Sequence, residues 1–494
     1  MSSRPSPRVR VAVLAACGLL AVPASASAQD PNATDLVQTV TRNGETLTMR
    51  LHKVPLRGPH FEVRVQNLLG GYDAYAPTGP DRAYLGTVDG RPGAVASGIV
   101  ADDGDLRGQI AFDRGATWFT DGTTVTGTRG LDAPTLKWPS TTTLSPGLAD
   151  GRMRAWDLGV DVTSGYYLNA GRGGSSAAKT LEQVEYSLSN VRAIYMRDAE
   201  TMPRLGRVVV RAVAARDPFA PGGTTAGLGA FRDEWRANQT DAVRDEALVV
   251  DAGGGGVAYR VAFGPDYAYA RSGSDDDGPF DVVTRHEIGH NWNVGDNESE
   301  NAEGATIMNG NGYARFSGPE LQTMLTSRKA RVDVLDDLGR WASTGLPPYA
   351  ALDLADDVAP GTTTTVDVLA NDHDANAQAL TLTAVDATTK AGGTARVADG
   401  KVRYTAPSGA YGLDSFGYTV TDACGQTATG VVLARASGTA ATATSAGAAT
   451  SGTTGTASAD AGRTTCASDG TGAGGTGTGP GGGSGAGTGG GTAG

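Results

Sequence analysis

The C-terminal segment of this 494-residue chain limits what the rest can fold into. Residues 436–494 contain no valine, leucine, isoleucine, phenylalanine, tyrosine or tryptophan, and alanine, threonine, serine and glycine dominate them. Such a segment cannot bury enough apolar surface to offset the entropy lost on ordering, so we expect a disordered tail. Hydrophobic residues make up 39% of the whole chain. The part before residue 436 can therefore build cores, and its length predicts about two to four domains.

The first 28 residues have the pattern of a secretory signal peptide. Basic residues within the first ten positions precede an apolar run at residues 11–22, and Ala26-Ser27-Ala28 follows as a small-residue cleavage site. The run is too short to span a bilayer. Cys17 would instead mark a lipoprotein, but the apolar run continues well past it. We therefore expect a secreted, extracellular protein without a membrane span, whose mature chain begins at Gln29.

Charge and cysteine content exclude several classes of protein. The chain carries 41 lysines and arginines against 53 aspartates and glutamates, a net charge of −12, and it has no basic stripe. This composition argues against nucleic-acid binding. Three cysteines are too few for a disulfide-rich scaffold or a multi-cysteine zinc module. Cys424 and Cys466 are able to pair in an oxidising compartment.

Two regions of the chain are expected to contain only strands. In residues 29–151, apolar and polar side chains alternate at Leu47, Met49 and Leu51, and glycine-containing turns follow the alternating runs. Short alternating runs with turns between them also fill residues 344–435, at the spacing typical of a β-sandwich.

Residues 152–343 combine helices and strands. Apolar residues recur at steps of three and four over residues 181–195, which predicts an amphipathic helix. A β-branched run at residues 207–213 suits a buried strand. Further helices are expected from Asp281 and from Ser317, where an S-x-x-E capping box begins. This mixture predicts one α+β domain.

The segment His286-Glu287-Ile288-Gly289-His290 contains two of the five histidines in the chain. On a helix, positions i and i+4 share one face, so both imidazoles can bind the same tetrahedral metal. Glu287 then lies beside the metal without binding it, where a carboxylate can act as general base and acid. Zinc in such a site acidifies a water molecule and polarises a carbonyl. The pattern therefore predicts zinc-dependent hydrolysis of peptide bonds.

Asp296 follows ten residues after the first of these histidines. This spacing resembles the H-E-x-x-H-x-x-G-x-x-H/D pattern of the metzincin zinc peptidases, and the resemblance implies that Asp296 is the third zinc ligand. The family has glycine at the turn, where this chain has Asn293, a residue that tolerates the left-handed backbone almost as well. Glu298 and Glu300 are alternative donors. Otherwise these two glutamates and Glu303 are expected to form a solvated acidic loop.

The segment Thr306-Ile307-Met308-Asn309 resembles the methionine turn of metzincins, which implies that Met308 supports the histidines from below. With Arg315-Phe316-Ser317, it makes residues 153–340 similar to the reprolysin (ADAM-type) family. The resemblance implies an α+β metzincin-like catalytic domain, with a twisted mixed sheet and an active-site helix. It also implies that a strand at Val257–Val261 lies at the sheet edge and pairs with an extended substrate.

Tyr84–Gly90 and Leu106–Ile110 resemble the propeptide of the same family. No cysteine lies between residues 29 and 151, so a cysteine cannot silence the zinc. Latency would require steric cover or another ligand. The alternative is a β-domain that stays permanently attached.

Residues 344–435 are similar to bacterial Ig-like or cadherin-like repeats, on the strength of Val366–Asp372 and Asp414–Asp422. Related repeats often serve adhesion or spacing. The resemblance therefore implies a surface ligand of this domain as one possible partner.

Calcium is a second candidate metal. Asn371, Asp372 and Asp374 offer the oxygen donors that Ca²⁺ prefers, but a plain polar turn is the favoured explanation. Asp275-Asp276-Asp277-Gly278 allows the same two interpretations, a calcium site or a solvated loop.

Taken together, the sequence predicts a secreted zinc endopeptidase that acts on protein or peptide substrates. His286, His290 and Asp296 would bind zinc, Glu287 would be the catalytic residue, and Met308 would support the site. The alternative is a non-catalytic secreted or surface adhesion protein that retains a peptidase-like shell. Glu287 argues for the enzyme, because only catalysis needs it.

Overall fold

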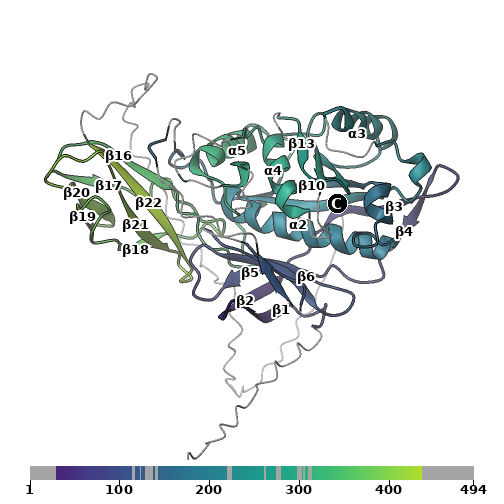
Figure 1. Ribbon diagram of the computed structural model, residues 1–494, viewed down its shortest axis with the longest axis horizontal. Helices are drawn as coiled ribbons and strands as arrows, with labels where there is room; N and C mark the ends of the chain where they lie inside the picture. The colour runs from purple at the N-terminus through teal and green to yellow at the C-terminus, as the bar shows by residue number, and fades with distance from the viewer. Residues whose placement is uncertain are drawn as a thin grey trace, which may run out of the picture.

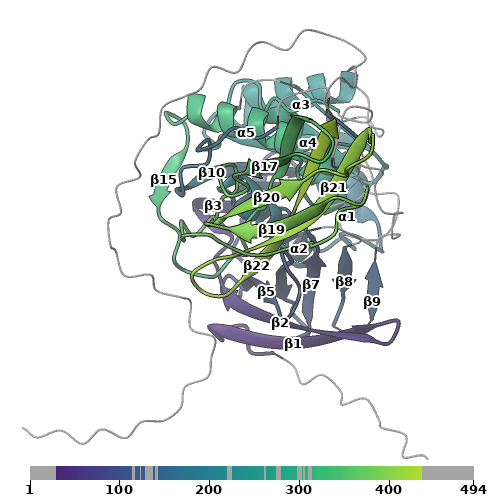
Figure 2. The same ribbon diagram turned by 90° about the vertical axis from the view of Figure 1, so that its left-hand side faces the viewer.

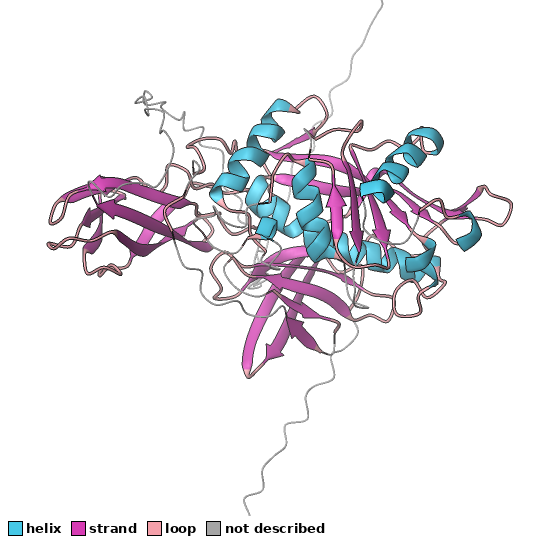
Figure 3. Cartoon of the chain, turned by 45° about the horizontal axis from the view of Figure 1, so that its top comes forward, coloured by secondary structure: helices cyan, strands magenta, loops and turns pink. Residues whose placement is uncertain are grey.

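The computed structural model shows three regions that pack against one another (Figure 1). It describes residues 29–113, 117–122, 124–127, 137–139, 143–219, 225–260, 263–273, 280–296, 303, 306–309 and 314–436. The expected signal peptide and, apart from Ala436, the expected tail lie outside these residues. Among the described residues, helices are confined to one region, and the other two regions contain strands (Figure 3). The mixed α+β class is therefore confirmed.

The N-terminal sheet has seven antiparallel strands in the order β1-β2-β5-β6-β7-β8-β9, and Figure 2 shows it below the C-terminal strands. Asn43 and Gly44 both have positive φ and form the tight turn between β1 and β2. Leu47, Met49 and Leu51 are buried on one face, as their alternation predicts. The strands are β1 (Asp35–Arg42), β2 (Glu45–Lys53), β5 (Ala83–Val88), β6 (Val95–Val100), β7 (Leu106–Ala111), β8 (Trp118–Thr120) and β9 (Val125–Gly127).

The central sheet has the order β13-β14-β12-β10-β11-β3-β4, and β15 pairs with the start of β10. The five inner strands run parallel, whereas the edge strands β4 and β13 are antiparallel to their neighbours. The strand expected at residues 207–213 belongs to β11 and ends at Val210. The strands are β3 (Arg57–Gln66), β4 (Tyr72–Tyr75), β10 (Met153–Val162), β11 (Thr201–Val210), β12 (Glu246–Asp251), β13 (Gly256–Ala258), β14 (Tyr269–Gly273) and β15 (Asp336–Gly339).

Two strands of this sheet, β3 and β4, come from the N-terminal region. Val63 of β3 lies opposite Val208 of β11 in a parallel pair. Leu56 and Val63 belong to the same core as Trp156, which lies on β10. The division between residues 29–151 and 152–343 thus stays a prediction from composition, whereas the sheet and its core include both segments.

Helix α2 lies between the central and N-terminal sheets, in contact with β11 on one side and β6 on the other. This position explains why most of its residues are buried, charged ones included. α3 covers the opposite face of the central sheet, and α5 begins at the predicted capping box of Ser317 and Glu320. No helix in the described part of the chain is long and apolar enough to cross a membrane. The helices are α1 (Ser164–Leu168), α2 (Ala177–Ala199), α3 (Thr225–Asn238), α4 (Asp281–Asn291) and α5 (Gly318–Ala330), with 3₁₀ turns η1 (Ala214–Arg216) and η2 (Ile307–Asn309).

The C-terminal region is a β-sandwich of a four-stranded sheet, β16-β22-β21-β18, and a three-stranded sheet, β17-β20-β19. Val402, Phe416 and Val432 lie in the core between them. Cys424 is disulfide-bonded. Because Cys466 lies outside the described residues, its pairing with Cys424 stays a prediction. The strands are β16 (Leu352–Val358), β17 (Thr363–Val366), β18 (Thr381–Val385), β19 (Thr394–Ala398), β20 (Lys401–Thr405), β21 (Leu413–Thr421) and β22 (Thr427–Ala436).

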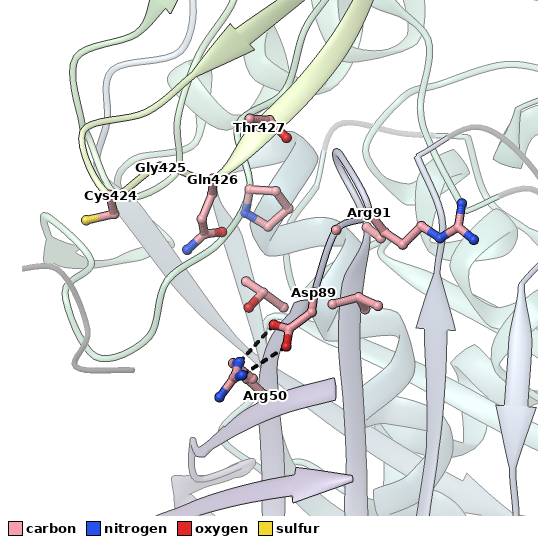
Figure 4. Close-up of a pocket in the computed structure, with 12 residues that line it drawn as sticks. Arg50, Asp89, Arg91, Cys424, Gly425, Gln426 and Thr427 are labelled. Atoms are coloured by element: carbon pink, nitrogen blue, oxygen red, sulfur yellow. Dashed lines mark hydrogen bonds and ion pairs between the residues drawn. The ribbon is translucent and has the colours of Figure 1, made fainter. Parts of the chain in front are cut away.

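A cavity of about 260 Å³ separates part of the N-terminal sheet from the β-sandwich (Figure 4). Arg50 and Asp89 form a bidentate ion pair on one wall, with N–O distances of 2.8 and 2.9 Å. Gln426 and Thr427 line the opposite wall. Beside the cavity, the amide of Gly93 donates to the carbonyl of Thr427 at 2.6 Å. The two β regions therefore contact each other directly.

Candidate metal centre

His286 and His290 lie one turn apart on α4, with their ring centroids 4.8 Å apart. Each Nδ1–H donates to a backbone carbonyl, His286 to Ile307 at 2.9 Å and His290 to Val294 at 2.8 Å. Because a carbonyl only accepts, these bonds place the ring hydrogen on Nδ1 and leave the Nε2 lone pair free for a metal. Burial also lowers the pKa of His290, which favours the neutral form that binds metals.

Asp296 completes a group of three potential ligands. Its Oδ1 lies 3.2 Å from Nε2 of His286 and 3.6 Å from Nε2 of His290. One potential ligand atom from each of the three residues lies within 4.8 Å of the other two. Among the described residues, no other three His, Cys, Asp or Glu side chains form such a group. The group offers two imidazole nitrogens and one carboxylate oxygen, and it is exposed on the side of Asp296. Three such donors with an open position are typical of a catalytic zinc site. The residues present therefore fit zinc.

The turn after α4 brings Asp296 back to the histidines. Asn293 has φ of +71°, the left-handed conformation that the family pattern assigns to glycine. Amides then close the helix end: Asn293 donates to His290 at 2.8 Å and Val294 donates to Gly289 at 3.1 Å. Arg260 Nε also donates to the carbonyl of Asn293 at 3.0 Å. Sequence reasoning missed Arg260, since nothing in the pattern links it to this turn.

Replacing Asn293 tests this conformational requirement. Asn293→Gly should retain the fold and zinc binding, because glycine adopts positive φ without strain. Asn293→Val should destabilise the protein by about 1–2 kcal/mol, because a β-branched residue resists this conformation. Thermal unfolding and zinc titration of both variants measure the effect. Equal behaviour of the two would show that the turn does not depend on residue 293.

Glu287 lies on α4 between the histidines and the edge strand β13. The side chain is buried, and its Oε2 has no hydrogen-bond partner among the described residues. Burial, and next the negative charge of Asp296, raises the pKa of the Glu287 carboxyl to about 8. A cation bound by the histidines would oppose this shift and favour the carboxylate.

Gly256 of β13 makes room for this carboxyl group. A Cβ at Gly256 would lie 2.6 Å from Cδ of Glu287, closer than packed atoms approach. Sequence reasoning missed this contact, because nothing in the sequence links this glycine to Glu287.

Met308 packs against α4, the helix that carries both histidines. It is fully buried in η2, and a Cβ at Gly289 would lie 2.6 Å from its sulfur. The neighbouring carbonyl of Ile307 accepts the hydrogen bond from His286. The short 3₁₀ turn therefore supports α4 through packing and through the hydrogen bond from His286.

Contacts at its middle and at its C-terminal end fix α4 in place. Tyr195 of α2 donates its hydroxyl to the carbonyl of Arg285 at 2.7 Å. Asn291 Nδ2 donates to the carbonyl of Tyr259 at 2.7 Å, which ties the helix to the residue after β13. Trp292 is fully buried at the helix end. The residues that flank the histidines in sequence thus position the helix that bears them.

The expectation of a solvated loop is wrong for Glu303. Its side chain is buried, accepts from the amide of Gly318 at 2.8 Å, and pairs with Arg315 at 3.3 Å. A charged side chain is buried when a partner compensates its charge, and that partner is visible only in the fold. Glu298 and Glu300 lie outside the described residues, so their role as alternative ligands stays a prediction.

Two of the three candidate calcium donors of the β-sandwich, Asp372 and Asp374, accept hydrogen bonds through one carboxylate oxygen each. Asp372 Oδ1 accepts from the amide of Ala351 at 2.7 Å. Asp374 Oδ1 accepts from the amides of Asn376 and Gln378 at 2.9 and 3.0 Å, as in a polar turn. Calcium binding here stays a prediction, and Asp275, Asp276 and Asp277 lie outside the described residues.

Comparisons with known proteins place the C-terminal region in a family. Residues 346–435 match the family described as "Bacterial Ig domain", which confirms the Ig-like assignment. No curated protein matches the chain. Metalloproteinase-II from Bacteroides fragilis is a similar solved structure, with 12% identity over 60% of this chain and 92% of that chain and a TM-score of 0.30. A nucleoside hydrolase-related hypothetical protein from Saccharophagus degradans has 10% identity over 34% of this chain and 35% of that chain, with a TM-score of 0.15. These two TM-scores are too low to assign an activity.

Proposed function

We propose that this protein is a secreted zinc-dependent endopeptidase of the metzincin type. One observation carries the proposal: two tautomer-fixed histidines and Asp296 converge on one point, and the Glu287 carboxyl lies on the same helix beside them. The edge strand β13 next to this carboxyl gives the site a backbone against which an extended peptide can lie.

His286 and His290 would hold zinc through Nε2, and Asp296 through a carboxylate oxygen. Bound zinc would lower the pKa of a coordinated water and polarise the scissile carbonyl. The Glu287 carboxylate would act as general base, taking a proton from the water molecule that attacks the peptide carbon. It would then act as general acid and return that proton to the amine nitrogen as the C–N bond breaks. No residue of the chain becomes covalently attached to substrate.

The edge strand β13 would align the substrate. It pairs only with β14 among the described strands, so its outer side offers backbone groups to an added strand. Its first residue, Gly256, packs on Glu287. A peptide paired with β13 would therefore pass the general base at close range.

Metal removal tests the proposal. The secreted chain should cleave unfolded casein, and a zinc chelator should reduce cleavage at least about 100-fold, because metal catalysis supplies several kcal/mol of transition-state stabilisation. Adding stoichiometric zinc should restore the rate. Peptide release and zinc content are measured on the same samples.

The alternative, an adhesion protein with a peptidase-like shell, predicts the opposite outcome. Zinc binding without chelator-sensitive cleavage, in a preparation whose thermal unfolding is cooperative, would favour it. A serine-protease inhibitor serves as the control, because it should leave the cleavage unchanged.

A further inference from the structure

The N-terminal region contributes to the interior of the central sheet. β3 lies between β11 and β4, so it is paired on both sides. Leu56 and Val63 are at most 2% exposed and share a core with Leu205 of β11. Removing this region would expose the edge of β11 and part of the main core.

Buried arginines of α2 depend on the same region. Arg192 is fully buried and donates to the carbonyls of Pro55 and Val54 at 2.7 and 2.9 Å. Arg197 is 1% exposed and donates to the carbonyl of Gly93 at 2.9 Å. Without the N-terminal residues, both guanidinium groups would lose acceptors that compensate for their burial.

Arg315 links the N-terminal region to the candidate metal centre. Its side chain pairs with Asp113, which follows β7 in the chain. The same side chain donates to the carbonyl of Ala350 at 2.6 Å, shortly before β16 begins. The carbonyl of Arg315 accepts from the amide of Ile307 at 3.0 Å, and the carbonyl of Ile307 accepts from Nδ1 of His286 at 2.9 Å. Two hydrogen bonds, one between backbone groups and one from the His286 side chain, thus join a proposed zinc ligand to the arginine that pairs with Asp113.

The N-terminal sheet packs on the side of α2 that faces away from the histidines. α2 contacts β5, β6 and β7 on one side and α4 on the other, and Figure 1 shows the sheet below α2 and α4 above it. The N-terminal sheet therefore supports α4 through α2.

We propose that residues 29–127 remain part of the active enzyme and support the metal centre through the Asp113–Arg315 pair. The region is then a permanent, activating component of the catalytic unit instead of an inhibitory propeptide that must leave. This inference rests on the proposed zinc site, although retention of the region is testable without it.

Cutting the chain after β9 tests whether the N-terminal region is retained. A recognition sequence for a site-specific protease is inserted into residues 128–136, between β9 and β10, and the full chain is cut under native conditions. Both fragments should elute together in size-exclusion chromatography and separate only in denaturant. Spontaneous separation, or higher peptidase activity after cutting, would overturn the proposal.

Asp113→Asn tests whether the Asp113–Arg315 pair supports the metal centre. We expect zinc affinity to fall by up to about 10-fold, the lower end of the cost of losing a direct partner of a ligand, because Asp113 acts through Arg315 and Ile307. The visible spectrum of the Co²⁺-substituted protein should shift, because the position of His286 changes. Asp113→Glu keeps the charge and should largely restore both. Asp89→Asn breaks only an exposed pair with Arg50 and should change neither.

The outcomes separate this inference from the proposed function. The proposed support of the metal centre by the Asp113–Arg315 pair would be wrong if Asp113→Asn left zinc affinity and the cobalt spectrum unchanged. An increase in activity would also overturn it. Failure of every variant and of the parent chain to bind zinc would instead refute the zinc site. The cut-chain experiment would still decide retention in that case, and thermal unfolding of Asp113→Asn shows whether the variant is folded.

Discussion

Replacing Glu287 with glutamine is expected to lower kcat by about 10²- to 10⁴-fold while zinc stays bound. Glutamine has nearly the same shape, so it fits beside Gly256 as the glutamate does. Its amide, however, cannot accept the proton of the attacking water. Kinetics on a fluorogenic peptide and metal content by atomic absorption, both from one preparation, measure the two effects separately.

Glu45→Gln provides the matched control, because Glu45 lies in the N-terminal sheet and pairs with Arg91 away from the site. It should retain the parent kcat. A Glu287→Gln enzyme with undiminished kcat would exclude Glu287 as the general base. Loss of zinc together with activity would make Glu287 a structural residue of the site.

Replacing Asp296 with alanine is expected to weaken zinc binding by more than about 100-fold, which exceeds the cost of losing an orienting partner. The carboxylate is the single anionic donor of the trio, and two neutral imidazoles alone leave the site one protein ligand short of the usual three. Asp296→His should retain much of the affinity, because imidazole is an equally suitable zinc donor. Competition with a chromophoric chelator measures both affinities.

Asp333→Ala is the control for this series, since Asp333 is 71% exposed and reaches Arg331 only at 3.6 Å. Its zinc affinity should equal that of the parent chain. If Asp296→Ala also binds zinc normally, the third ligand must lie elsewhere, and Glu298 and Glu300 become the residues to replace next.

Local sequence signals predicted the elements that carry the site. The three-and-four spacing predicted α2, and the capping box of Ser317 predicted the first turn of α5. The i, i+4 histidines required a helix, and α4 spans them. These predictions succeeded because each depends on residues within about one or two turns of one another.

Features that depend on distant partners were not predictable. Alternation shows that residues near Val63 form a strand, but nothing local identifies β11 as its neighbour. The sequence indicates that Glu303 is solvated, because only the fold shows that Arg315 pairs with it. The need for glycine at position 256 arises from the Glu287 side chain on another element. In each of these contacts, the two partners lie on segments that are not adjacent in the sequence.

The pairing of β3 with β11 also affects how the chain reaches its native state. Glu62 and Arg207 lie opposite each other in this pair although 145 residues separate them. Contacts of such long range form late, because the loop between them must first close. The central sheet is complete only when β15, at residues 336–339, has joined β10. The segments before and after residue 151 therefore cannot acquire stability one after the other during synthesis, and we expect them to fold and unfold in one cooperative transition.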